Sequence, residues 1–367
     1  MKIKNIVVTG EQGFLHRHQF LFKTLSSYFE HLEYIPSGEF YENKILNTLI
    51  KLFNIIIAKI SLTRASRFWK NEKAFIARSK LTERKIRRLT YTPDLIFHVF
   101  SQYSPLWNKF DIPYVMYLDY TMALARRNWI SWSPFSTEKE FADWEKCERK
   151  AYEQACYIFT MSNLVKSSLV QDYGINSEKI TVIGSAANRQ PYEGEKTFGR
   201  KVILFNGSDF ERKGGNLVIA AFKQVTKAIP EARLVIIGKS LSITEAGVDN
   251  PGRISSVSEM DNLFLKADLV VAPALCDPFP TFVIEALNYG VPCIVSASDG
   301  MPEIIDNGMN GIVIEQQTSD VLAQEIIHLL GDIPRLKSMS EKAREKVKNQ
   351  LNWDSIAKNI SQVLSTL

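Results

Sequence analysis

The sequence predicts an α/β protein with two doubly wound parallel sheets, and three observations support this prediction. Its 367 residues are enough for two domains of ordinary size. Hydrophobic residues make up 45% of the chain and charged residues 23%, which is the composition of a folded globular protein and not of a disordered one. Short apolar runs alternate with longer segments of helical periodicity, which is typical of strands that are covered by helices on both faces.

The apolar runs fall into two successive sets, each long enough for one sheet. The predicted strands are Ile6–Val8, Leu95–Phe97, Tyr114–Tyr117 and Tyr157–Phe159 in the first half, then Val202–Phe205, Leu234–Ile237, Leu269–Val271, Cys293–Val295 and Ile312–Ile314. In the second half, helical periodicity predicts helices over about 214–229 and 281–289.

These sets predict a first domain over residues 1–185 and a second over residues 196–350. The stretch 184–200 between them has no periodicity and is rich in Gly, Pro, Asn and charge, so it is predicted to be a linker. Residues 353–367 form an amphipathic helical pattern, which we expect to pack back on the first domain.

Several protein classes are excluded by composition. The four cysteines are far apart and contain no C-x2-C pair, which argues against a zinc knuckle or a disulfide framework. A net charge of +5 is too small to indicate nucleic-acid binding. The most apolar stretch, Ile45–Ile60, is interrupted by Asn and Lys, and the N-terminus lacks the pattern of a secretory signal. We therefore expect a cytoplasmic protein.

Two loops that follow predicted strands carry candidate ligand-binding groups. The loop after Phe205 contains Gly207 and the cations Arg212 and Lys213 directly before a helix, an arrangement suited to a diphosphate. A solvated Arg-Lys pair on a turn is the alternative. The segment after the strand at 269–271 contains Asp277 and, eight residues later, Glu285. The helix that begins near Thr281 would direct free amide groups toward the strand ends, unless Asp277 is only a turn residue and Glu285 an exposed one.

These motifs resemble the donor-binding domain of family 4 retaining glycosyltransferases, which have the GT-B fold. The matching elements are Asp277-x7-Glu285 with an internal Phe-Pro, Gly290-Val291-Pro292, and Arg212-Lys213-Gly214. The resemblance is strong over about 202–316 and weak over the first 150 residues. It implies two Rossmann-like domains facing a cleft, with the C-terminal helix crossing back to the first domain.

The resemblance also implies roles for residues of the second domain. Lys213, with Arg212 beside it, would neutralise the diphosphate of a UDP- or GDP-sugar, and Asp277 would contact the transferred sugar. Glu285 would accept hydrogen bonds from the ribose. The remaining implied donor-binding residues are Gly207, Pro280, Thr281 and Phe282, together with Gly13 of the first domain. The loop 10–13 that contains Gly13 is otherwise a plain turn from a strand to a helix. No obligatory metal is expected, because no Asp-x-Asp motif lies in a suitable strand-end loop. No other obligatory cofactor is expected.

The first domain is expected to bind the acceptor, a glycan or a lipid-linked glycan. Asp119 follows a predicted strand where many relatives carry a His-Asp pair, so we predict that it lines the cleft, with a possible role as general base. His16 and His98 are weaker candidates, since a lone histidine is more often structural. Arg126 and Trp129 belong to the stretch 126–135, which is rich in Arg and Trp and either binds the acceptor or packs as a surface loop.

The segment 59–88 is strongly basic. It contains eleven Lys or Arg residues against only Glu72 and Glu83, and apolar side chains are interleaved. Such a stretch indicates either adsorption to an anionic membrane surface or a solvated helix face on the first sheet.

The leading hypothesis from the whole sequence is a retaining glycosyltransferase for cell-surface polysaccharide or glycolipid. The alternatives are a nucleotide-sugar epimerase of the same fold and a non-catalytic nucleotide-sugar-binding subunit.

Overall fold

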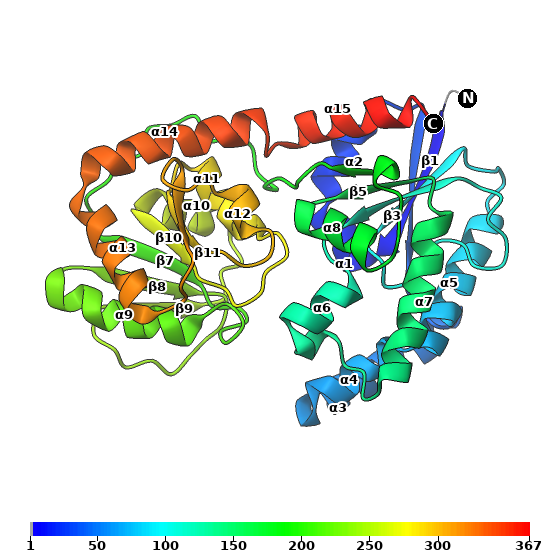
Figure 1. The fold of residues 1–367 in the computed structure, drawn as a ribbon, viewed down its shortest axis with the longest axis horizontal. Helices are drawn as coiled ribbons and strands as arrows, with labels where there is room; N and C mark the ends of the chain where they lie inside the picture. Colours follow the sequence, from blue (N-terminus) through cyan, green and yellow to red (C-terminus); the bar gives the residue numbers. More distant parts are fainter. Residues whose placement is uncertain (1–2) are drawn as a thin grey trace. The chain divides into compact units, whose positions relative to one another are not determined.

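A computed structural model describes residues 3–367, apart from the side chains at positions 60, 62 and 63. The chain divides into two compact units: one contains the residues up to Gly184 together with Ile356–Leu367, and the other contains Ser185–Ser355. The first two residues of the predicted domain 1–185 lie outside the described part. Each unit contains one six-stranded sheet in which all neighbouring strands are parallel (Figure 1). The predicted α/β architecture with two doubly wound sheets is confirmed.

The sheet of the first unit has the strand order β2-β1-β3-β4-β5-β6. Its strands are β1 (Asn5–Glu11), β2 (His31–Ser37), β3 (Leu95–Val99), β4 (Tyr114–Leu118), β5 (Tyr157–Thr160) and β6 (Ile180–Val182). The central strands β3 and β4 are fully buried, which is why they form continuous apolar runs in the sequence.

Helices connect these strands, and the α3–α4 hairpin lies at one end of the first unit, away from its sheet (Figure 1). The helices are α1 (Gln12–Arg17), α2 (Gln19–Leu25), α3 (Lys44–Ile60), α4 (Leu62–Trp69), α5 (Glu72–Arg87), α6 (Met122–Asn128), α7 (Glu138–Gln154) and α8 (Asn163–Gln171), with short 3-10 turns at Ile130–Trp132 and Ser177–Lys179. The first unit also contains the last helix, α15 (Trp353–Leu364), from Ile356 onward. In α15, Ile356, Ala357, Ile360 and Leu364 are buried, as expected for an amphipathic helix that is docked by one face.

The sheet of the second unit has the order β12-β11-β10-β7-β8-β9. Its strands are β7 (Val202–Asn206), β8 (Arg233–Ile237), β9 (Val248–Gly252), β10 (Leu269–Ala272), β11 (Cys293–Ser296) and β12 (Gly311–Ile314). Its helices are α9 (Gly215–Ala228), α10 (Val257–Lys266), α11 (Thr281–Asn288), α12 (Met301–Ile304), α13 (Ser319–Gly331) and α14 (Ile333–Asn349). In Figure 1, α9 and α13 lie on one side of the strands and α10, α11 and α12 on the other.

Three strands of the structure have no counterpart among the predicted ones. They are β2, β6 and β9, and each lies at an edge of its sheet. The residues of β2 are mostly exposed or half-buried, and β9 has the sequence VDNPG. An edge strand is covered on fewer sides, so it needs no continuous apolar run and can even accept proline.

The stretch 184–200, predicted to be a linker, is instead fastened to the second unit. The buried Lys196 donates hydrogen bonds to the backbone oxygens of Phe264, Leu265 and Ala267, at 2.9, 2.7 and 2.5 Å. These carbonyls belong to the last turn of α10 and the residue after it, where the helix leaves acceptors unsatisfied. Burial lowers the pKa of Lys196 to about 8. A buried ammonium that caps a helix is not visible in a pattern of loop residues, which explains the difference.

We predict that Lys196→Met destabilises the second unit by about 2 kcal/mol, because the aliphatic stem still fills the space but the α10 carbonyls lose a charged donor. Differential scanning calorimetry would measure this as a lower unfolding temperature. The matched control is Lys227→Met, which removes a charge from an exposed position of α9 in the same unit. Equal unfolding temperatures for the two variants would contradict the capping role.

Candidate functional site

The candidate site lies where the strand order of the second sheet reverses. Strands β7 and β10 are neighbours, although β8 and β9 separate them in the sequence. From β7 the chain proceeds to one edge of the sheet, and from β10 it proceeds to the other. The loops after these two strands therefore diverge, which leaves a crevice at their carboxyl ends where ligands of doubly wound sheets bind.

Two backbone contacts join the loops that follow β7 and β10. Gly214 has a φ of +79°, and a Cβ at this position would lie 2.3 Å from the carbonyl oxygen of Pro273. The amide of Leu275 donates a hydrogen bond of 2.8 Å to the carbonyl of Arg212. Only glycine permits both the left-handed backbone and this close approach. The two loops are thus held together by the backbone itself.

The Arg212 guanidinium is largely buried in these loops. Its Nε donates to Asp209 Oδ2 at 2.7 Å, its Nη1 donates to the carbonyl of Cys276 at 2.5 Å, and the same Nη1 lies 3.5 Å from Asp277 Oδ2. The side chain predicted to assist at the diphosphate therefore fixes the loop that carries Asp277. Gly207, at the start of the same loop, donates a hydrogen bond from its amide to the carbonyl of Ile237. A Cβ at position 207 would lie 3.0 Å from the Ile236 side chain, so the glycine lets the loop pass close to β8.

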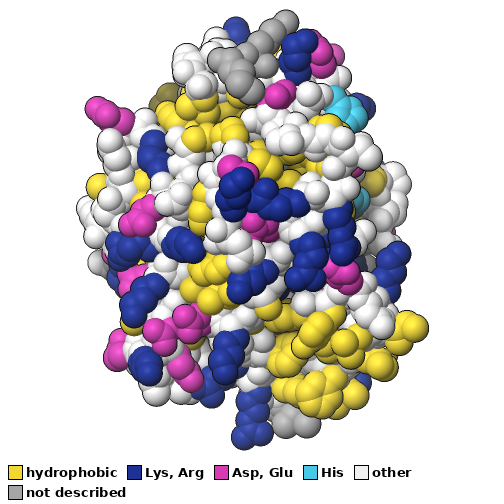
Figure 2. Space-filling view, turned by 90° about the vertical axis from the view of Figure 1, so that its right-hand side faces the viewer, with side chains coloured by type: hydrophobic (Ala, Val, Ile, Leu, Met, Phe, Trp, Pro, Cys, Tyr) yellow, Lys and Arg dark blue, Asp and Glu magenta, His cyan; other side chains and the backbone are white. Residues whose placement is uncertain are grey.

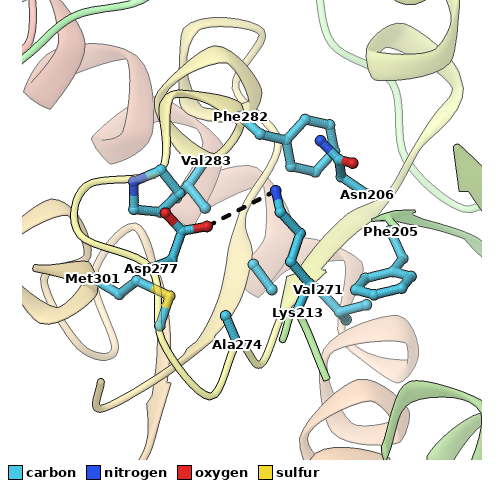
Figure 3. Close-up of a pocket in the computed structure, with 11 residues that line it drawn as sticks. Phe205, Asn206, Lys213, Val271, Ala274, Asp277, Phe282, Val283 and Met301 are labelled. Carbon is cyan, nitrogen blue, oxygen red and sulfur yellow. Dashed lines mark ion pairs between the residues drawn. The ribbon is translucent and has the colours of Figure 1, made fainter. Parts of the chain in front are cut away.

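Lys213 and Asp277 point toward each other across a pocket in the second unit (Figure 3). The Lys213 Nζ lies 3.8 Å from Asp277 Oδ2, and both side chains are largely but not completely buried. A partly desolvated cation interacts more strongly with a negative ligand than one in bulk water. The remaining lining residues are Phe205, Asn206, Val271, Ala272, Ala274, Pro280, Phe282, Val283 and Met301.

The first turn of α11 forms another part of the pocket wall. The helix begins at Thr281 directly after Pro280, and no side chain caps its N-terminus. The first amide groups of a helix have no partner within it and carry partial positive charge. Thr281 and Glu285 are one turn apart on the half-buried face of α11, whereas its six other residues are buried. Lys213 and an uncapped helix start thus line the same pocket.

Glu285 belongs to a charged group on the same side of α11. Burial raises the pKa of Glu285, while the nearby Arg189 guanidinium lowers it and Asp261 raises it further. Arg189 Nε lies 3.9 Å from Glu285 Oε1, and Arg189 also pairs with Asp261. Tyr289 donates a 2.7 Å hydrogen bond to Asp261, and burial together with this bond raises the pKa of Tyr289 to about 12. Arg189 therefore lies beside the carboxylate to which the resemblance assigns the ribose contact.

Sequence reasoning missed three polar residues of this region. Asn206 lines the pocket, and Arg189 lies in the stretch that was expected to be a linker. Asp299 has a φ of +49° and accepts a 2.8 Å hydrogen bond from the amide of Asp277, so the loop after β11 also positions Asp277. Of the three, Asn206 could most easily have been predicted, because it directly follows a predicted strand and precedes the basic loop.

In the first unit, the two histidines that were predicted to contact an acceptor lie in different environments. His98 is fully buried: its Nδ1 lies 2.7 Å from Thr9 Oγ1, and its Nε2 lies 2.8 Å from the carbonyl oxygen of Tyr103. Burial lowers the pKa of His98 to about 3. His98 is therefore a structural residue of the core and does not present a nitrogen to a ligand. His16 is exposed on α1.

The other predicted residues of the first unit lie near the carboxyl ends of its strands or in the following segments. Asp119 is half-buried directly after β4. Gly13 is exposed in α1, and a Cβ there would meet nothing within 4 Å, so this glycine is not required by packing. Arg126 pairs with Glu138 and lies over the Phe141 ring, with 4.3 Å between its guanidinium carbon and the ring centroid. Trp129 is half-buried at the end of α6.

Glu148 of α7 is a buried carboxyl group in the first unit. It accepts hydrogen bonds from Ser101, Tyr173 and the amide of Met122. Burial raises its pKa to about 7, although these donors act in the opposite direction. Burial also lowers the pKa of Lys70 to about 8, an effect that the charges of Glu148, Glu11 and Asp119 oppose. Sequence analysis missed Glu148 because it lies within a highly charged helical segment.

A second cavity of about 300 Å³ lies beside the turn between α4 and α5. Its lining includes Lys70, Pro134, Phe135 and Asp143, so part of the stretch predicted to bind an acceptor borders a real cavity. Across residues 3–367, no group of three or more His, Cys, Asp or Glu side chains is placed to hold a metal ion.

The fold of the chain is the two-unit GT-B fold of glycosyltransferases. Sucrose-phosphate synthase from Thermosynechococcus elongatus matches with a TM-score of 0.70 and 16% identity over 99% of this chain and 98% of that one. The Anabaena protein HepE, in complex with UDP and glucose, matches with a TM-score of 0.66 and 15% identity over the full length of both chains.

Residues 188–346 match the sequence model of glycosyl transferases group 1. An uncharacterized glycosyltransferase of Methanocaldococcus jannaschii is 26% identical over 235 residues, which cover 57% of this chain and 60% of that protein. The chain spans about three fifths of the length of the first curated relatives that it matches. The resemblance inferred from the motifs is confirmed.

We predict that Glu148→Gln makes the first unit less sensitive to pH. The carboxyl has a higher pKa in the folded state than in the unfolded state, so folding favours its protonated form. Its contribution to stability is therefore present below about pH 4.5 and is lost as the pH rises to about 7. Glutamine imitates the neutral form. Relative to the wild type, the variant should gain at most about 3 kcal/mol between pH 4.5 and pH 8.

Urea unfolding followed by tryptophan fluorescence suits this test, because five of the six tryptophans lie in the first unit. Replacing the carboxyl group by a carboxamide also changes the free energy of unfolding by an amount that does not depend on pH. This amount cancels when the difference between wild type and variant is compared at the two pH values. Glu153→Gln, at an exposed position of the same helix, is the control and should show a constant difference. A constant difference for Glu148→Gln as well would rule out the raised pKa.

Proposed function

We propose that the protein is a retaining glycosyltransferase that moves a sugar from a UDP- or GDP-sugar to a hydroxyl group of a glycan or lipid-linked glycan. The observation that carries this proposal is the pocket at the β7–β10 crevice, which is lined by both Lys213 and the uncapped start of α11. The family match over residues 188–346 supports it, as does the likeness in fold to HepE, whose structure contains UDP and glucose. The product would be a cell-surface polysaccharide or glycolipid.

In the proposed reaction, the bond between the anomeric carbon and the diphosphate oxygen breaks while the acceptor oxygen bonds to the same face of that carbon. The acceptor proton passes to the leaving diphosphate. Negative charge on the diphosphate increases along this path, so a fixed cation and aligned amides stabilise the transition state more than the ground state. Lys213 would supply the cation, and the amides of Thr281 and Phe282 would supply the dipoles.

The charged residues around the pocket would share the remaining tasks. Asp277, which Arg212 and Asp299 hold in place, would accept hydrogen bonds from hydroxyl groups of the transferred sugar. Glu285, which lies beside Arg189, would accept hydrogen bonds from the ribose hydroxyls. In the first unit, Asp119 remains the candidate for contact with the acceptor hydroxyl, and the cavity bordered by Lys70 and Phe135 is a candidate acceptor site.

We predict that Lys213→Ala lowers turnover about a hundredfold or more, since one preorganised contact to a developing charge contributes roughly 2.7–4 kcal/mol to the barrier. The assay would use purified full-length protein, a panel of UDP- and GDP-sugars and a panel of glycan acceptors. Lys227→Ala removes the same charge from an exposed position of α9 and should retain full activity. Near-normal transfer by Lys213→Ala would remove this lysine from the mechanism.

Thermal-shift measurements with the same nucleotide-sugars identify the donor before any acceptor is known. A ligand at 100 times its Kd stabilises the folded state by about 2.7 kcal/mol. The reaction products then separate the possible activities. Consumption of the donor without an acceptor, with inversion of one sugar carbon, would favour an epimerase. Donor binding without turnover across the acceptor panel would favour a non-catalytic subunit.

A further inference from the structure

Helix α3 presents an apolar face to solvent. Six side chains along it follow the spacing of a single helix face, and they are between 40% and 73% exposed. They are Ile45, Leu46, Leu49, Leu52, Phe53 and Ile56. Figure 2 shows a continuous hydrophobic area in the lower part of this view, over the hairpin of α3 and α4. Contiguous apolar patches on a protein surface mark interaction sites more often than scattered single residues do.

The opposite face of α3 is the one that packs on the protein. Asn47 is buried, and its Oδ1 accepts a 3.2 Å hydrogen bond from the amide of Phe40. The Phe40 ring packs against Phe68 and Trp69 of α4, with centroid distances of 5.6 and 4.8 Å. Asn43 caps the helix by accepting hydrogen bonds from the amides of Ile45 and Leu46. The helix is therefore anchored with its more apolar face directed outward.

Positive charge borders the apolar face. Lys44, Lys51 and Lys59 are exposed, and their spacing of seven and eight residues places them along one edge of α3. The helix contains no acidic residue. The exposed Arg64 and Lys73 extend the positive charge into α4 and α5. In Figure 2, Lys and Arg side chains lie above and beside the hydrophobic area.

Most of the basic segment 59–88 has another task. Six of its eleven cations pair with carboxylates of the same unit, and Arg78, which pairs with Glu11, is buried. The pairs are Arg67–Glu140, Arg78–Glu11, Arg84–Glu42, Lys85–Glu39, Arg87–Glu83, Arg87–Asp111 and Arg88–Glu42. The side chain of Lys70 donates to the carbonyl of Trp132. A charge count over this segment therefore overstates what is available to a membrane.

We propose that α3 docks on an anionic lipid bilayer, with its apolar side chains in the interface and its lysines at the level of the headgroups. Amphipathic helices with a large apolar face and a basic edge lie in the bilayer surface in this way. Contact with a second copy of this chain is less suitable, because a twofold contact through α3 would bring together two lysine-edged helices that offer no carboxylates. The docking surface is thus α3 and its flanks, in place of the whole segment 59–88.

This inference does not depend on sugar transfer, although it suits a lipid-linked acceptor. No helix within residues 3–367 is both long enough and apolar enough to cross a membrane. Docking through α3 would therefore be peripheral. It would also be sensitive to ionic strength, since salt screens the attraction between the lysines and anionic headgroups.

The test is co-sedimentation of the full-length protein with vesicles of phosphatidylcholine alone or with 30% phosphatidylglycerol. We expect binding to the anionic vesicles, and we expect 0.5 M NaCl to weaken it. Leu49→Ser combined with Phe53→Ser should lower the partition constant at least tenfold. Lys51→Gln combined with Lys59→Gln should lower it roughly 25-fold at low salt, because each basic residue near the surface contributes about a factor of five.

The control for the apolar pair is Val257→Ser, which shortens an exposed apolar side chain of the second unit and should bind like the wild type. All variants should keep the wild-type unfolding temperature and the same thermal shift with nucleotide-sugars, which separates this inference from the proposed enzymatic function. It would be overturned by wild-type protein that ignores anionic vesicles or by a double-serine variant that binds them normally. It would equally be overturned by a dimer in sedimentation equilibrium that this variant dissociates.

Discussion

The candidate site depends on one contact, the approach of the backbone at Gly214 to the carbonyl of Pro273. This contact brings the loop after β7 against the loop after β10 at the point where the strand order reverses. The helix start at Thr281 and the ammonium group of Lys213 come from these two loops, and the two residues are 68 positions apart in the sequence. A side chain at position 214 would force the loops apart, and the pocket would lose the combination of cation and helix dipole.

The neighbouring cations Arg212 and Lys213 have different roles. The Arg212 guanidinium has several donors in one plane, so it can hold Asp209 and the carbonyl of Cys276 at once, whereas the single ammonium of Lys213 reaches the pocket. The buried arginine thus holds the loop that carries the slightly more exposed lysine. Their order in the sequence does not reveal this difference, because it depends on which side chain is turned inward.

The interior of both sheets could be predicted from the sequence, and the edges could not. Strands such as β4 and β10 are buried on both faces and must be apolar throughout, so each forms a continuous apolar run in the sequence. Strand β9 needs only one neighbour and contains Asn250 and Pro251, so its sequence resembles a turn. The loss of this information is physical, since an edge strand is selected by backbone pairing more than by burial.

The site was predictable to the extent that it is local in sequence. Lys213, Asp277 and Glu285 belong to motifs within two short segments, and the structure brings the first two within 3.8 Å of each other. Arg189 and Asp299 come from other segments and act on those residues through tertiary contacts. His98 misled prediction for the opposite reason, because its place near a strand end fits a ligand contact and a buried hydrogen-bonding role equally well.

The assignment of Ile356–Leu367 to the first unit has a consequence for the order of events during synthesis. The second unit is continuous from Ser185 to Ser355, so the ribosome completes it before it adds Ile356. The first unit, although translated earlier, still lacks the helix surface formed by Ile356, Ile360 and Leu364 at that time. The apolar side chains of the first unit that this helix covers therefore remain exposed until the second unit has been synthesised.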